Sequence, residues 1–109
     1  MDLQEIQELV RQGNYEFSFH AQQERLEENL DITEIETAVV GTAEILEEYP
    51  SDPRGESCLL LGFAGSRPVH VVLGWAERKR DGRKILRVIT VYIPTLPKWI
   101  NPRTRGTTT

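Results

Sequence analysis

Three side chains of this sequence have types that could transfer protons near neutral pH: His20, His70 and Tyr92. A neutral imidazole accepts a proton near pH 7, and a phenol can donate one to a leaving oxygen. His20 begins a predicted helix, whose dipole favours the neutral base form. His70 and Tyr92 lie in predicted strands otherwise suited to burial, and Thr90 adds a hydroxyl to the strand of Tyr92. Such polar atoms indicate either a site on a sheet or core side chains with satisfied hydrogen bonds.

Three arginines, Arg25, Arg67 and Arg87, are candidate anion-binding residues. A guanidinium group makes bidentate contacts to phosphate or carboxylate oxygens, so these side chains could bind a negatively charged substrate. Arg25 has a structural alternative, because Glu24 and Glu28 belong to the same predicted helix and could pair with it.

A basic stretch at residues 78–84 contains five of the 13 Lys and Arg residues. Asp81-Gly82 within it is typical of a tight hairpin turn. The stretch is therefore either a solvated hairpin tip or a surface that follows the phosphates of a nucleic acid. In the second case Trp75 or Trp99 could stack on a base.

Several other kinds of site are not expected. Two histidines and one cysteine without close spacing make a poor zinc site, so we predict no metal. The sequence has no glycine-rich phosphate loop and no nucleophile elbow, and we predict no cofactor. Cys58 precedes three leucines, which indicates a buried thiol, and as the only cysteine it has no internal disulfide partner.

The charge is distributed unevenly along the 109 residues. Residues 1–66 carry a balance of −12 and residues 67–109 a balance of +8, which gives the net charge of −4. This pattern allows one basic face, and it equally allows the two halves to attract each other within the fold. The first residues are acidic and polar, unlike a secretory signal, and no apolar run approaches the length of a membrane span. We expect a cytoplasmic protein with no membrane contact.

The residues above must be positioned by a central strand, predicted at 85–93 from its β-branched and apolar side chains. Strict alternation would place Arg87 with Ile89, Val91 and Ile93 on one face, and Leu86, Val88, Thr90 and Tyr92 on the other. If this strand pairs with the strand at 69–76, His70 could neighbour the face of Thr90 and Tyr92.

The remaining pattern predicts helices first and strands afterwards. Helices are expected after Asp2, from Ser18 to about residue 29, and after a capping box of Thr33 and Glu36. Strands are expected near 14–17, at 43–49 and at 57–64. The result is a single α+β domain, 1–100, whose helices pack on a mainly antiparallel sheet of four to five strands. Residues 101–109 are predicted to form a disordered tail.

Five segments of the chain, taken in order, carry a resemblance to a known family. They are SFHAQQERL (18–26), DITEI (31–35), EILEEYP (44–50), RPVHVV (67–72) and VITVYIP (88–94). Together they resemble a prokaryotic family of small uncharacterised proteins related to the RelE/ParE-like toxin superfamily. The resemblance covers most of residues 15–94 and implies a RelE/ParE-like α+β fold. It also implies an antitoxin as a possible partner.

The superfamily includes endoribonucleases, gyrase poisons and proteins without known activity, so the resemblance implies more than one function. Metal-independent RNA cleavage needs a base, an acid and cations, for which His20, His70 and Tyr92 and the three arginines are the candidates. We expect a toxin-like protein, either an endoribonuclease acting on mRNA, alone or on the ribosome, or a non-enzymatic interaction or target-blocking protein. The oligomeric state is left open.

Overall fold

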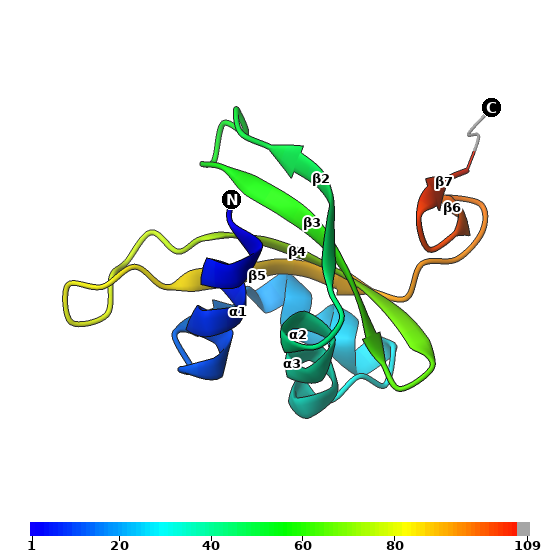
Figure 1. Cartoon of the computed structure of the whole chain (residues 1–109), viewed down its shortest axis with the longest axis horizontal. Helices are drawn as coiled ribbons and strands as arrows, with labels where there is room; N and C mark the ends of the chain where they lie inside the picture. The colour runs from blue at the N-terminus through cyan, green and yellow to red at the C-terminus, as the bar shows by residue number, and fades with distance from the viewer. Residues whose placement is uncertain (107–109) are drawn as a thin grey trace.

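The computed structural model describes residues 1–106, which fold into three helices and seven strands (Figure 1). The α+β class predicted from the sequence is confirmed. The elements in chain order are α1 (Leu3–Arg11), β1 (Tyr15–Phe17), α2 (Phe19–Glu27), α3 (Ile32–Val40), β2 (Glu44–Tyr49), β3 (Ser57–Ala64), β4 (Arg67–Trp75), β5 (Leu86–Tyr92), β6 (Trp99–Asn101) and β7 (Thr104–Arg105).

Five strands form one sheet in the order β1-β5-β4-β3-β2, and β6 and β7 form a separate two-stranded hairpin. Strands β2 to β5 pair antiparallel in chain order, as their spacing predicted. Strand β1 pairs parallel with β5, so the sheet is mixed. Strand β5 lies between β1 and β4, which confirms its predicted internal position.

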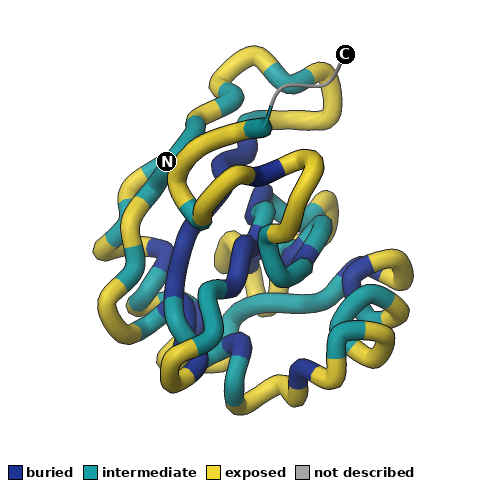
Figure 2. Tube along the Cα trace, turned by 90° about the vertical axis from the view of Figure 1, so that its right-hand side faces the viewer, coloured by how far each residue is buried: buried dark blue, intermediate teal, exposed yellow. Residues whose placement is uncertain are grey.

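The three helices cover one face of the sheet (Figure 1). Gly62 of β3 lets α3 approach closely, because a Cβ atom there would lie 2.0 Å from the carbonyl oxygen of Ala38. The buried positions follow the central strands and the helix faces turned toward them (Figure 2). The core between helices and sheet includes Ile6, Val10, Ala21, Ile35, Ala38, Val39, Cys58, Leu60, Val69, Val71, Leu73, Leu86, Val88 and Val91. None of the helices in residues 1–106 is long and apolar enough to cross a membrane.

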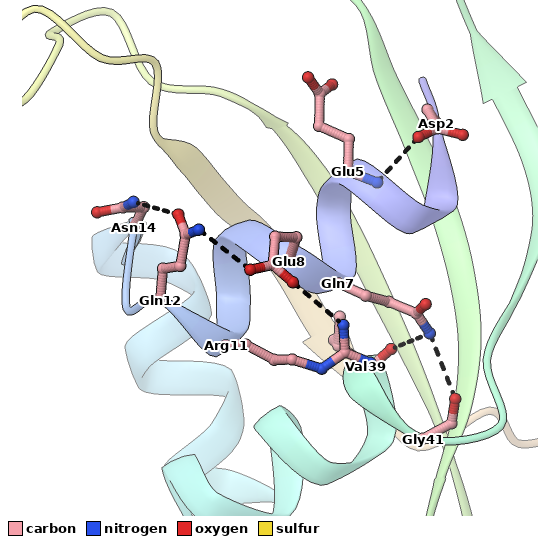
Figure 3. A network of polar contacts seen from close by, with 9 residues as sticks. All are labelled: Asp2, Glu5, Gln7, Glu8, Arg11, Gln12, Asn14, Val39 and Gly41. Atoms are coloured by element: carbon pink, nitrogen blue, oxygen red, sulfur yellow. Dashed lines mark hydrogen bonds and ion pairs between the residues drawn. The ribbon is translucent and has the colours of Figure 1, made fainter.

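The helix caps agree with the sequence for α1 and α2 and differ for α3. The Asp2 side chain accepts a hydrogen bond from the Glu5 amide, and Gln7 joins α1 to the end of α3 by donating to the carbonyl of Val39 (Figure 3). The predicted capping box of Thr33 and Glu36 is wrong. Helix α3 begins two residues earlier than that pair requires, with Asp31 as N-cap and Glu34 completing the box.

A β-bulge in β5 changes which side chains share a face. Val72 pairs with Thr90 and Leu73 with Val88, so Ile89 is an extra residue without a partner on β4. Leu86, Val88 and Val91 consequently face the helices, and all three are buried. Arg87, Thr90 and Tyr92 lie on the opposite face, which we call the open face. The alternation predicted from the sequence, with Thr90 and Tyr92 beside Leu86 and Val88, is corrected by this bulge.

The C-terminal segment also differs from the sequence-based expectation. Disorder was predicted for 101–109, whereas residues 99–105 form the β6–β7 hairpin. The Trp99 side chain is buried, and Arg103 and Arg105 form ion pairs with Glu44 and Glu47 of β2. These contacts order a segment whose composition alone resembles a flexible tail. The last part of that prediction, residues 107–109, lies outside the described residues.

Candidate functional site

A cavity of about 670 Å³ opens on the open face beside the start of α2. It gathers three of the residues singled out from the sequence, His20, Arg87 and Thr90, which come from two elements. The other residues that line it are Ser18, Asp52, Arg54, Gly55, Glu56, Val72, Gly74, Trp75, Glu77 and Ile89.

Ser18 places His20 at this cavity. Its backbone amide donates to the Val88 carbonyl, and its hydroxyl donates to the Ile89 carbonyl while accepting from the Ala21 amide. The N-cap of α2 is therefore fixed to β5, which sets the position of the first helical turn. His20 lies in that turn with its side chain two-thirds exposed, so its ring is accessible to a ligand.

Glu24 connects His20 to the sheet. Its Oε1 atom lies 3.3 Å from His20 Nε2, one helical turn away, and accepts from the Val91 amide at 3.2 Å. Because the strand fixes this carboxylate, Glu24 can orient the imidazole and stabilise its protonated form. A histidine held by an anchored carboxylate is an arrangement suited to accepting a proton from a bound hydroxyl.

The bulge in β5 brings Arg87 and Thr90 into the same cavity wall. Arg87 Nη1 lies 2.9 Å from Glu16 Oε2 on β1, and both side chains are only partly exposed. The guanidinium is thereby oriented across the open face and retains donors for a ligand. Arg54 approaches from the loop after β2 and lies 3.4 Å from Asp52.

Trp75 joins the cavity to the basic hairpin between β4 and β5. Its indole nitrogen donates to Glu56 at 3.3 Å, and Lys84 Nζ lies 4.7 Å from its ring centroid. Trp75 is partly exposed. Trp99 is 3% exposed, so Trp75 is the tryptophan placed to stack on a base.

The basic hairpin at 78–84 differs from the rest of residues 67–109 in how its charges are paired. Four ion pairs join the two halves: Arg67–Glu34, Arg87–Glu16, Arg103–Glu44 and Arg105–Glu47. The predicted attraction between the halves is therefore real. Within residues 1–106, however, no acidic side chain pairs with Arg78, Lys79 or Arg83, and all three are exposed. These side chains leave a positive surface next to Trp75.

His70 and Tyr92 are neighbours, as their strands predicted, but they lie apart from the cavity. They are partners in the β4–β5 register, and His70 Nδ1 is 3.2 Å from the Tyr92 hydroxyl. His70 Nε2 is 2.7 Å from the Pro102 carbonyl oxygen, which can only accept, so this nitrogen carries the proton. Nδ1 then accepts from Tyr92.

The β6–β7 hairpin covers this pair. The Trp99 ring meets the His70 ring edge-on with 4.4 Å between centroids, and His70 is fully buried. Burial lowers the pKa of His70 and raises the pKa of Tyr92. Both imidazole nitrogens are occupied, so in this arrangement His70 has no free atom for a substrate.

Arg25 and Arg67 also lie outside the cavity lining. Arg25 donates to Gln22 and to the Leu30 carbonyl, which closes the end of α2. Arg67 pairs with Glu34 of α3. The structure thus gives both arginines contacts within the fold and places neither beside His20.

Sequence reasoning missed four charged residues of the cavity, Asp52, Arg54, Glu56 and Glu77. Three of them lie in or next to the loop at 50–56, whose prolines and glycine predicted only a turn. The charged residues of this loop, which connects two predicted strands, could have indicated a binding site, because such residues often lie on loops.

The described part of the chain contains neither a group of side chains that could bind a metal ion nor a reactive thiol. Residues 1–106 contain no group of three His, Cys, Asp or Glu side chains that could hold a metal ion. Cys58 is buried in the core, and this burial raises the pKa of its thiol to about 11. The thiol is therefore protonated at neutral pH.

A family comparison covers the part of the chain that builds the cavity. The sequence model of a family described as Domain of unknown function (DUF4258) matches residues 17–93. The chain belongs to the DUF4258 family. The matched region runs from the end of β1 through β5 and contains every candidate site residue from His20 to Tyr92, whereas α1 and the β6–β7 hairpin lie outside it. No curated protein and no solved structure matches this DUF4258 chain.

Proposed function

We propose that this protein is a toxin-type, metal-independent endoribonuclease that acts on mRNA, and that it is related to RelE/ParE-like toxins. One observation carries the proposal: His20, Arg87 and Thr90 line a single cavity whose wall includes Trp75, and Lys84 of the basic hairpin lies over the Trp75 ring. RNA supplies phosphates as partners for the cations of this surface and a base as a partner for the indole.

In the proposed reaction His20 takes the proton of a ribose 2′-hydroxyl, whose oxygen then attacks the adjacent phosphorus. The bond from phosphorus to the 5′-oxygen breaks, which leaves a 2′,3′-cyclic phosphate and a 5′-hydroxyl. Water in the open cavity protonates the leaving oxygen, because the Tyr92 hydroxyl is hydrogen-bonded to His70 beneath the hairpin. The hydroxide that remains takes the proton from the His20 imidazolium, which restores the neutral ring. Arg87 and Arg54 neutralise the developing phosphorane charge, and Glu24 stabilises the imidazolium.

The test compares the same substitution at the two histidines. His20→Gln should slow cleavage of mRNA, measured with and without ribosomes, by about 10²–10⁴-fold at unchanged thermal stability. His70→Gln is the matched control, and it should lower thermal stability while the folded fraction keeps its cleavage rate. If the wild-type protein neither cleaves RNA nor arrests growth on induced expression, the enzymatic proposal is wrong.

A non-enzymatic alternative has its own support. Two of the three candidate proton-transfer residues, His70 and Tyr92, bond to each other beneath the hairpin. The same basic surface would then block a target, such as a ribosome or its mRNA, without cutting it. In that case His20→Gln should leave growth arrest unchanged, whereas reversing the charges of Arg78, Lys79 and Arg83 should abolish it. An antitoxin partner and a cytoplasmic location belong to both versions of the proposal.

A further inference from the structure

The open face has a second region, separate from the cavity, that the chain's own C-terminal segment covers. Here the side chains of Leu59, Leu61 and His70 are no more than 1% exposed. Leu61 lies directly across from His70 on the neighbouring strand. We call these three residues, with Glu44 and Glu47 at their rim, the tail-docking surface.

A bulge in β2 gives this surface its two carboxylates. Glu44 pairs with Leu61 and Glu47 with Leu59, and the register shifts between them. Leu59 and Leu61 share a face, so the shift turns both glutamates to the same side although they are three residues apart. The rim of the apolar surface is therefore negatively charged.

The tail matches this surface by charge and by shape. Arg103 Nε lies 2.5 Å from Glu44, and Arg105 makes two hydrogen bonds to Glu47 at 2.6 and 2.8 Å. Arg105 also lies over the Trp99 ring, 4.7 Å from its centroid, while that ring packs on His70. The pairing lowers the pKa of Glu47, as expected for a carboxylate that receives a guanidinium.

The sheet beneath does not depend on the tail for its backbone hydrogen bonds. Strand β3 is paired on both sides, by β2 and β4, whereas β6 and β7 pair only with each other. The tail is held by one tryptophan, one hydrogen bond to His70 and two ion pairs whose arginines are 58% exposed. Exposed ion pairs of this kind contribute little to stability. The surface is thus preformed, and within residues 1–106 its cover has no backbone pairing with the sheet.

We propose that the tail-docking surface binds a short hairpin-forming segment of a partner protein that carries an aromatic residue followed by two arginines. The chain's own tail, with the pattern Trp-x-x-x-Arg-x-Arg at 99–105, occupies the surface until such a segment displaces it. This binding site shares no residue with the RNA cavity, so the inference stands independently of the proposed ribonuclease activity.

The experiment uses the full-length chain and a fluorescent peptide, WINPRTR, with blocked ends. Trp99→Ala, Arg103→Ala and Arg105→Ala together release the tail. Fluorescence anisotropy should show that this variant binds the peptide at least about tenfold more tightly than wild type, whose own tail competes at high effective concentration. Adding Glu44→Gln and Glu47→Gln should weaken that binding by about 2- to 30-fold, because both ion pairs with the peptide are lost. Glu5→Gln, an exposed carboxylate on α1, is the matched control and should leave it intact.

Three results would overturn the inference. They are equal affinity of the wild-type and tail-released chains, no binding to either chain, and an affinity that Glu44→Gln with Glu47→Gln leaves unchanged. If circular dichroism shows the triple variant to be unfolded, Arg103→Ala with Arg105→Ala replaces it. A wild-type dimer that Trp99→Ala dissociates, detected by light scattering, would identify a second copy as the occupant and would also overturn the proposal.

Discussion

His70 illustrates how one residue can have the right chemical type and the wrong accessibility. Its strand position predicted correctly that it would neighbour Tyr92. The sequence could not indicate its cover, because Trp99 and Pro102 reach it from about thirty residues along the chain. His20, by contrast, is accessible. Its position at a helix N-terminus was predicted, but the cavity beside it is formed by a bulge and a loop that the local sequence pattern does not predict.

The burial of His70 predicts a dependence of stability on pH. Its pKa in the folded state is lowered below the ordinary value of 6.5, because burial disfavours the charged form. Folding therefore favours the neutral ring, and this contribution is complete above the unfolded pKa and is lost as pH falls toward the folded pKa. Urea unfolding between about pH 7.5 and about pH 5 should show decreasing stability, and His70→Gln should flatten that slope.

The control for this measurement is Thr33→Ala, which changes an exposed side chain that does not titrate and should keep the wild-type slope. The pH range stays above the titration of the carboxylates that gain partners in the fold, such as Glu47. A His70→Gln variant with an unchanged slope would show that another group carries the pH dependence.

The sequence predicted which helices and strands exist better than it predicted where each of them begins and ends. The Asp2 and Ser18 caps follow from their own side chains and the apolar positions after them. For α3 the segment Asp31-Ile32-Thr33-Glu34 offers two capping candidates two residues apart. The structure uses Asp31, and Ile35 is then buried against the sheet at the fourth helical position. Tertiary packing, which the local pattern does not contain, decides between the two.

Substitutions at these two candidates should have unequal effects. Asp31→Ala removes the acceptor of the Glu34 amide and should lower the free energy of unfolding by about 0.5–2 kcal/mol. Thr33→Ala changes an exposed residue inside the first turn and should cost less than about 0.5 kcal/mol. Chemical denaturation of the two single variants measures both values. Equal losses would contradict the assignment of the N-cap.

The whole molecule uses its uneven charge in two ways. Four arginines of the basic half pair with carboxylates of the acidic half. The hairpin at 78–84 extends beyond the reach of those acids, and its exposed cations give the molecule one basic end. Composition showed the imbalance, but only the topology shows which cations are paired. The ordered tail was missed for the same reason, since its partners Glu44 and Glu47 are distant in sequence.

If the basic end binds RNA, the binding should depend strongly on salt. Changing Arg78, Lys79 and Arg83 together to Glu removes three phosphate contacts. This should reduce the slope of log affinity against log salt concentration by about 2 for single-stranded RNA. Lys98→Glu, an exposed cation on the tail, is the control and should leave the slope unchanged. Filter binding across a salt series measures the slope, and equal slopes for all variants would exclude the hairpin from the interface.

The extra residue in β5 has a consequence for how the chain can change in length. Ile89 and Thr90 both point away from the helices, so removing either one would restore regular alternation and leave Leu86, Val88 and Val91 inside. Removing Val88 would instead delete a core side chain and bring one of the two bulge residues to the helix side. A loss of one residue at the bulge would therefore preserve the core and remodel only the cavity floor. The cavity can thus change its shape by insertion and deletion while the fold remains the same.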